Sequence, residues 1–304
     1  LHRQPVTAEQ EPHYIKRCAA SADGGVIVGA AGDDYSFKLC DGRQGTLLKS
    51  LPQNSRLADC DVSRDGGQLV LALEDETPAV VDLGSGFPGR LIRLKGHTRD
   101  VNCCALSGDG RLVATGSRDA TLRIWNARTG AEQFVLVDEQ TFPASVERCA
   151  VNGDGSLVVI ISDWGRIRLV NGQTGKLYPN ALLDFADEID KMTDCAISDS
   201  GDIVLSVSRG QVLHVWQRMP DSAWPRWRGL HTMTGHEQRI NGCALSRSGH
   251  LAISASRDQS LRVWETLTGR CLATIGVDSP LHDCACWADG RYIVAAGQSG
   301  LYYL

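Results

Sequence analysis

Two sets of polar side chains recur at identical spacing, and each contains the residue types of an acid–base catalyst. Each set begins with a histidine, and a hydroxyl residue stands 18 positions after it, an aspartate 22 positions after it and a tryptophan 28 positions after it. The two sets are His97, Thr115, Asp119, Trp125 and His236, Ser254, Asp258, Trp264. A histidine and an aspartate beside a hydroxyl could activate a nucleophile. These residue types alone do not make a catalytic centre, because such a centre is defined by its geometry. A catalytic centre is also not expected twice in one chain at identical spacing. We therefore interpret both sets as structural hydrogen-bond networks.

Other catalytic and cofactor motifs are absent from the sequence. There is no glycine-rich phosphate loop followed by Lys-Ser/Thr, no G-x-S-x-G and no H-E-x-x-H. The acidic stretch 184–190 lacks EF-hand spacing. The 11 cysteines include no C-x-x-C pair and have no histidine at ligand spacing. We predict no catalytic residue, no cofactor and no metal.

The strongest pattern is a repeat that fills the chain. A cysteine recurs at intervals of 41 to 48 residues, at Cys18, Cys60, Cys104, Cys149, Cys195, Cys243 and Cys284. A glycine follows each of them by six positions, at Gly24, Gly66, Gly110, Gly155, Gly201, Gly249 and Gly290. A period in the forties is typical of units of four strands each.

The third unit shows these elements most clearly. Residues 101–107 and 111–117 are apolar and strand-like, 121–125 alternates, and 132–137 makes a fourth strand, with turn sequences between them. A single four-stranded sheet leaves two faces exposed, so stacking around an axis is needed to bury them. We predict an all-β fold, a seven-bladed propeller that occupies residues 1–304 as one domain.

Composition and charge narrow the class of partner. The formal net charge is −5, which argues against nucleic acid and anionic membranes as partners. No apolar run reaches the length of a membrane span, and the first residues contain no signal-peptide core. An odd number of cysteines, seven of them at equivalent positions, favours buried free thiols in a reducing, cytoplasmic compartment.

The two polar sets resemble the WD40 propeller family, in which a Gly-His pair precedes the Asp and the Trp of a blade. The matching pairs are Gly96-His97 and Gly235-His236. The resemblance implies a buried His–Ser/Thr–Asp–Trp set in the third and sixth units. Other units depart from the pattern. The Trp position is Cys40 in the first unit, Val81 in the second and Val170 in the fourth. The Asp position is Trp164 in the fourth unit and Gly210 in the fifth, which keeps its tryptophan, Trp216.

The same family closes its ring by letting the N-terminal strand complete the last blade. The last unit ends at residues 301–304 after a third strand, and a spare stretch precedes the first unit. We therefore expect residues 2–7 to pair with residues 301–304. The first residue is not Met, so we also expect a longer or processed polypeptide.

Binding is expected on loops, because no chemistry is visible. In this family the commonly used face carries the turns between second and third strands. The position before the turn Asp gives a ring of candidate protein-binding residues, Asp33, Glu74, Arg118, Asp163, Arg209, Arg257 and Gln298. The position before the repeated cysteine adds charges around the central opening, Arg17, Asp59, Arg148, Asp194 and Asp283.

A second candidate interface is the irregular stretch 219–228. It contains Trp224, Arg226, Trp227 and Arg228, residue types that are enriched at interfaces. The alternative is that both tryptophans fold back onto the edge of a blade.

The predicted function is a non-catalytic protein-interaction domain that is monomeric in isolation. The repeat style resembles bacterial WD40 modules, which often lie C-terminal to switch ATPases, kinases or caspase-like proteases. By this resemblance we expect the sensor or autoinhibitory module of a larger signalling protein. Two alternatives stay open, a free-standing scaffold and a propeller enzyme or small-ligand binder that uses its central channel.

Overall fold

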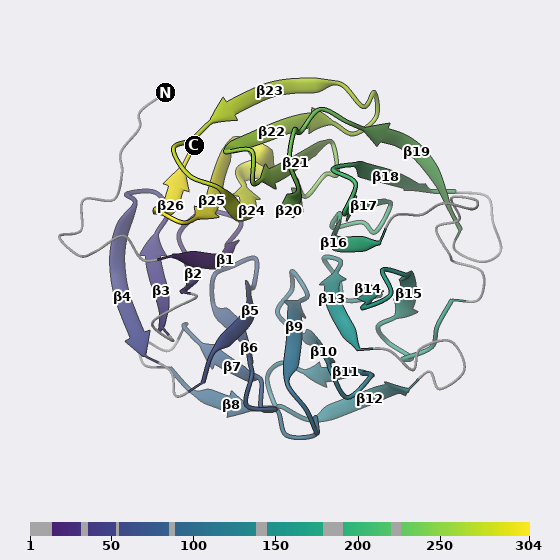
Figure 1. Cartoon of the computed structure of the whole chain (residues 1–304). Helices are drawn as coiled ribbons and strands as arrows, with labels where there is room; N and C mark the ends of the chain where they lie inside the picture. Colours follow the sequence, from purple (N-terminus) through teal and green to yellow (C-terminus); the bar gives the residue numbers. More distant parts are fainter. Residues whose placement is uncertain are drawn as a thin grey trace.

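The computed structural model describes residues 14–31, 36–52, 55–84, 89–137, 145–178, 191–219 and 226–304. Seven antiparallel sheets stand around a common centre as the blades of a propeller (Figure 1). The predicted seven-bladed fold is thus confirmed. Among the described residues, no helix is long and apolar enough to cross a lipid bilayer.

Strands follow one another from the centre of the ring to its rim, and we number the blades 1 to 7 in chain order. The first, innermost strands are β1 (Ile15–Ala20), β5 (Leu57–Val62), β9 (Val101–Leu106), β13 (Val146–Val151), β16 (Met192–Ile197), β20 (Ile240–Leu245) and β24 (Leu281–Trp287). The second strands are β2 (Ile27–Ala31), β6 (Gln68–Leu73), β10 (Leu112–Ser117), β14 (Leu157–Ser162), β17 (Ile203–Ser208), β21 (Leu251–Ser256) and β25 (Tyr292–Gly297). The third strands are β3 (Ser36–Asp41), β7 (Ala79–Asp82), β11 (Thr121–Asn126), β15 (Ile167–Asn171), β18 (Leu213–Arg218), β22 (Ser260–Glu265) and β26 (Gly300–Tyr303).

Fourth strands are described in five of the blades. They are β4 (Thr46–Pro52), β8 (Leu91–Arg93), β12 (Glu132–Val137), β19 (Trp227–Met233) and β23 (Cys271–Gly276). A short 3-10 turn, Ala288–Gly290, connects β24 to β25. The four strands predicted for the third unit are all present, with ends shifted by at most one residue.

The hydrophobic core lies between blades rather than within one of them. Seven clusters of buried side chains are present, and each joins two neighbouring blades. In the cluster between blades 3 and 4, for example, Ile124 packs with Val158 and Ile160. Each sheet therefore buries its two faces only by stacking, which is the reason that a single repeat would not be stable alone.

The repeated cysteine and glycine both serve this stacking. The seven repeat cysteines are buried and free of disulfides, as predicted. The Cys104 thiol lies 3.8 Å from the Val70 carbonyl oxygen of the preceding blade. The repeat glycines have φ values between 67° and 87°, and a Cβ at Gly155 would lie 3.1 Å from Cβ of Leu112 in the preceding blade. The turn therefore needs glycine both for its left-handed backbone and for close approach.

Blade 7 packs directly on blade 1 and closes the ring. The backbone N–H of Cys18 donates to Asp283 Oδ2 over 3.0 Å. Trp287 and Val294 share a buried cluster with Ile15 and Ile27. Residues 2–7, which we expect to complete blade 7, lie outside the described residues.

Candidate functional site

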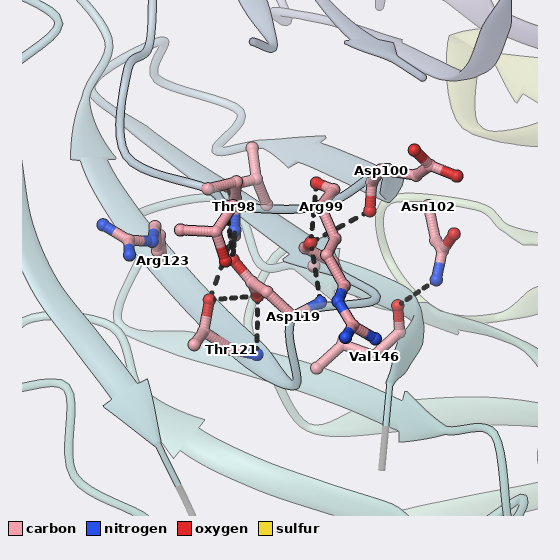
Figure 2. A network of polar contacts seen from close by, with 12 residues as sticks. Thr98, Arg99, Asp100, Asn102, Asp119, Thr121, Arg123 and Val146 are labelled. Carbon is pink, nitrogen blue, oxygen red and sulfur yellow. Dashed lines mark hydrogen bonds and ion pairs between the residues drawn. The ribbon is translucent and has the colours of Figure 1, made fainter. Parts of the chain in front are cut away.

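The polar set of blade 3 is a closed chain of hydrogen bonds. His97 Nδ1 lies 2.9 Å from Asp119 Oδ2, and its Nε2 lies 2.8 Å from Thr115 Oγ1. The Trp125 indole N–H donates to the same Thr115 oxygen over 2.8 Å. Asp119 also accepts hydrogen bonds from Thr121, as Figure 2 shows. Every strong donor and acceptor in the set therefore has a partner within the blade.

The polar set of blade 6 repeats this geometry. His236 lies 2.8 Å from Asp258 Oδ2 and 2.7 Å from Ser254 Oγ. The Trp264 indole N–H donates to Ser254 Oγ over 2.9 Å. Ser254, like Thr115, is 0% exposed. A hydroxyl that is buried and already accepts from tryptophan is poorly placed to attack a substrate, so the geometry supports a structural role for both sets.

Strand register explains which blades contain a polar set. On the second strand, the residue paired with the repeat cysteine carries a hydroxyl in blades 3, 5 and 6 and none in the other blades. From blade 1 to blade 7 these residues are Gly29, Leu71, Thr115, Ile160, Ser206, Ser254 and Ala295. In blade 5, Trp216 donates to Ser206 over 3.0 Å. Blade 5 thus keeps the bond between tryptophan and hydroxyl although Gly210 stands at its turn-Asp position.

One face of the ring is organised by a repeated backbone hydrogen bond. In each of five blades, the N–H of the residue that begins the turn between second and third strands donates to the carbonyl before the first strand. The donor and acceptor residues are Glu74 and Arg56, Arg118 and Asp100, Asp163 and Ser145, Arg209 and Lys191, and Arg257 and Arg239. This bond places two side chains of each blade together at one end of the sheet. We call this end of the propeller the turn face.

The side-chain charges on the turn face differ from blade to blade. Blade 2 carries opposite charges, Arg56 and Glu74. In blade 3, Arg118 Nη1 lies 3.0 Å from Asp100 Oδ2. Blades 5 and 6 each carry two positive charges, which are Lys191 and Arg209, and Arg239 and Arg257. Blades 2 and 3 therefore combine opposite charges at these positions, whereas blades 5 and 6 combine like charges.

The predicted ring residues that are described lie on this face. Arg118, Arg209, Arg257 and Gln298 are exposed, and Glu74 and Asp163 are half-buried. Asp33 lies outside the described residues.

The second candidate interface is divided by the fold. Trp227 begins β19 and is 8% exposed, because its indole packs in the core between blades 4 and 5. Arg226 and Arg228 are exposed, and Trp224 lies outside the described residues. Trp227 therefore stabilises the contact between blades, whereas Arg226 and Arg228 are the described candidate residues of this stretch that are exposed.

Charged residues on the innermost strands connect neighbouring blades. Aspartates in blades 2, 5 and 7 each accept a hydrogen bond from the backbone N–H of the repeat cysteine in the next blade; the acceptors are Asp59, Asp194 and Asp283. Arg17 Nε lies 3.7 Å from Asp59 Oδ1, and Arg148 Nε lies 3.5 Å from Asp194 Oδ1. We call these five residues the inner charge ring.

Burial shifts the titration of the inner charge ring. Burial raises the pKa of Asp59 to about 7, although Arg17 acts in the opposite direction. Burial also raises the pKa of Asp194 and of Asp283. Burial acts to lower the pKa of Arg17, but Asp283, Asp59 and Asp194 together raise it. Among the described residues, no group of three or more His, Cys, Asp or Glu side chains is arranged to hold a metal ion.

Three residues of the turn face were missed by sequence reasoning. Lys191 and Arg239 stand immediately before a first strand, a position we did not examine for charge. Trp164 occupies the turn-Asp position of blade 4, where we noted only a departure from the family pattern. It is 54% exposed. A large aromatic residue at an exposed turn position was the available indication in the sequence.

Comparison with known proteins identifies the type of repeat. Residues 89–126 and 227–265 match the model of the WD domain, G-beta repeat. These are the two segments that contain the complete polar sets. The protein is thus a seven-bladed β-propeller, two segments of which are similar to WD40 repeats.

Several curated proteins are similar to part of this chain. Apoptotic protease-activating factor 1 of Danio rerio is 32% identical over 95 residues, which is 31% of this chain and 7% of that protein. Nuclear distribution protein PAC1 of Arthroderma benhamiae is 26% identical over 132 residues, covering 36% of this chain and 29% of the relative. Target of rapamycin complex subunit LST8 of Mus musculus is 26% identical over 105 residues, covering 34% and 32% respectively.

The chain thus matches less than a third of the length of each of these relatives. They are animal and fungal proteins, so the resemblance to bacterial modules stays a prediction.

Proposed function

We propose that this chain is a non-catalytic protein-interaction domain whose partner binds the turn face. The observation that carries the proposal is the contrast between interior and face. Blades 3 and 6 share an interior hydrogen-bond set, yet their turn-face charges differ, because Arg118 stands beside Asp100 in one blade and Arg257 stands beside Arg239 in the other. Loops on a rigid scaffold commonly carry binding function.

The test is partner capture by a face-reversed variant. Arg118→Glu, Arg209→Glu and Arg257→Glu are combined, and the control combines Arg128→Glu with Arg270→Glu, exposed arginines in turns between third and fourth strands at the opposite end of the blades. We expect the face variant to lose partners that wild type and control retain in a source lysate, while all three proteins melt cooperatively. Unchanged capture by the face variant would exclude the turn face.

We further infer that the domain is a sensor or autoinhibitory module of a larger cytoplasmic signalling protein, in a bacterium and joined to a switch ATPase, kinase or caspase-like protease. The similarity to a small part of apoptotic protease-activating factor 1, whose name describes a protease activator, supports this. The similarity to a complex subunit supports the alternative of a free-standing scaffold. An immunoblot of source cells separates the two, because only a module gives a band far above 32.9 kDa.

The rival function is a small-ligand or enzyme site in the central channel. The raised pKa values of the inner charge ring are of the kind found at functional sites. Against this, its aspartates already accept hydrogen bonds from neighbouring blades. A ligand at 100 times its dissociation constant would stabilise the fold by about 2.7 kcal/mol. A melting-temperature shift with a metabolite that depends on Arg17 would favour the channel over the turn face.

A further inference from the structure

Four cations of blades 5 and 6 form a continuous group on the turn face. We call Lys191, Arg209, Arg239 and Arg257 the basic arc. The backbone bonds from Arg209 to Lys191 and from Arg257 to Arg239 hold the members of each pair together. Burial, together with the charges of Arg257 and Arg209, lowers the pKa of Arg239, so the two pairs lie within electrostatic reach across the boundary between the blades.

The described part of the chain does not neutralise the basic arc. Among the residues that the structure describes, none of its four members forms an ion pair or a side-chain hydrogen bond. Arg118, which occupies in blade 3 the position of Arg257, is by contrast paired with Asp100 at 3.0 Å. Like charges held together without counterions raise the energy of the free protein, and a bound anion would relieve this repulsion.

An exposed tryptophan extends the basic arc onto blade 4. Trp164 is 54% exposed and lies in the turn that contains Gly165. A Cβ on Gly165 would lie 2.6 Å from Cα of Lys191, so this turn directly contacts the first residue of the basic arc. Arg166 lies 6.0 Å from the centre of the Trp164 ring. Tryptophan and arginine together are the residue types that dominate binding energy at protein interfaces.

We propose that the basic arc and Trp164 bind a short Asp/Glu-rich peptide segment of a partner protein, with one apolar side chain of the peptide packed against Trp164. This proposal rests on the turn face being a protein-binding surface. Guanidinium groups bind carboxylates through two parallel hydrogen bonds, and three of the four cations are arginines.

The surroundings favour a short peptide over a long polyanion. The half-buried acids Glu74 and Asp163 stand on the same face, and the chain as a whole carries a net charge of −5. A nucleic acid or an anionic membrane would extend beyond the basic arc and meet these carboxylates. A peptide that spans only blades 4 to 6 avoids Glu74 of blade 2 and meets only Asp163 of these two acids.

The test is fluorescence anisotropy with a labelled peptide of alternating Asp and Glu that contains one central Phe. The comparison peptide has Asn and Gln in place of the acids, and a second comparison peptide has Ala in place of Phe. We expect wild type to bind the acidic Phe peptide, with an affinity that falls as salt rises. The two comparison peptides should bind at least about tenfold more weakly, which corresponds to 1.4 kcal/mol.

Matched variants locate the binding. Arg239→Ala with Arg257→Ala, and separately Trp164→Ala, should each raise the dissociation constant about tenfold or more. Arg270→Ala should leave it unchanged within about twofold, because Arg270 is exposed in the turn between β22 and β23, at the opposite end of blade 6. Equal loss in the Arg270 variant and in the basic-arc variant, or no preference for the acidic peptide, would overturn the proposal. So would tighter, Arg257-dependent binding of single-stranded DNA, of anionic vesicles or of a phosphorylated peptide.

The outcome is separable from that of the face-reversal experiment. If the face-reversed variant loses its partners but wild type ignores the acidic peptide, the turn face binds proteins of another chemistry and only the present proposal fails. If face reversal leaves capture unchanged, the proposed function itself fails, whatever the peptide does.

Discussion

Blades 3 and 6 have the same interior hydrogen bonds but different charge pairs on the turn face. In both, a histidine joins an aspartate to a buried hydroxyl that also accepts the tryptophan N–H. In both, an asparagine of the first strand donates to a carbonyl of the next blade, Asn102 to Val146 over 3.1 Å (Figure 2) and Asn241 to Leu281 over 2.7 Å. On the turn face, blade 3 carries a salt bridge, whereas blade 6 carries two arginines that have no ion-pair partner among the described residues.

The difference shows where the repeat is constrained. A buried polar group that loses its partner destabilises the fold, so each interior donor must occur with an acceptor. An exposed charge contributes little to stability whether or not it is paired, so the turn face can vary without harm to the blade. Divergence on the turn face is therefore available for binding.

The inner charge ring divides the blades in another way. Before the repeat cysteine, blades 3 and 6 carry the uncharged Cys103 and Gly242, whereas the other five blades carry an arginine or an aspartate. A Cβ on Gly242 would lie 2.6 Å from Asp283 Oδ1, so glycine leaves room for that carboxylate. Blades 3 and 6 thus contain the two complete polar sets, and blades 1, 2, 4, 5 and 7 contribute the charged residues of the inner charge ring.

The interior equivalence predicts the largest effect. Thr115→Val in blade 3 and Ser254→Ala in blade 6 each remove a hydroxyl and leave an indole N–H and an imidazole nitrogen unpaired. Each should lower the free energy of unfolding by about 2 to 4 kcal/mol, measured by urea denaturation. Values that differ by more than about 1 kcal/mol would show that the two interiors are not equivalent.

The inner charge ring predicts a distinctive pH dependence. The pKa of Asp59 is about 7 in the folded protein and lower when unfolded. Its contribution to stability is thus present below about pH 4 and is lost as pH rises through 7. Arg17, Asp194 and Asp61 surround this carboxyl. Asp59→Asn should remove this component, so that the change in stability between pH 5 and pH 8 differs from wild type by about 2 kcal/mol.

Asp65→Asn is the control for that measurement. Hydrogen bonds from the Ser63 hydroxyl and the Gly67 backbone N–H lower the pKa of Asp65, so its stabilisation is present above about pH 4 and is lost on acidification. This variant should keep the wild-type slope between pH 5 and pH 8. Parallel curves for Asp59→Asn and wild type would contradict the assignment.

The asparagine bridges predict a smaller, matched effect. Asn102→Ala and Asn241→Ala each remove one half-buried hydrogen bond between neighbouring blades and should cost about 1 kcal/mol. Thermal melting of the two single variants and of the double variant checks this. The double variant should show additive losses, because the bridges lie in different blades.

The turn face predicts the smallest effects, and they have opposite signs. Arg118→Ala removes a paired charge and should destabilise by about 0.5 kcal/mol or less. Arg257→Ala removes like-charge repulsion with Arg239 and should stabilise by a similar amount, about 0.5 kcal/mol, at low salt. Both differences should vanish in high salt, and destabilisation by Arg257→Ala would contradict the description of the basic arc as unneutralised.

Much of the fold could be predicted from the sequence, because repeated constraints leave repeated residues. The Cys-to-Gly spacing marks the first strand and its turn in all seven blades, since both residues pack against the preceding blade. The candidate site was harder to predict. Arg118 and Arg257 occupy equivalent positions in sequence, and only the neighbouring residues on the turn face, Asp100 and Arg239, make one paired and the other unpaired.

The sequence by itself determined the seven strand groups, the two complete polar sets and the face on which the variable turns lie. Periodic burial and hydrogen-bond needs act on residues close in the chain, so they are visible in a single sequence. The tertiary structure decided that Trp227 is buried, that Arg17 lies among aspartates, and that Trp164 adjoins the basic arc. Each of these depends on stacking between blades, which brings together side chains from separate repeats.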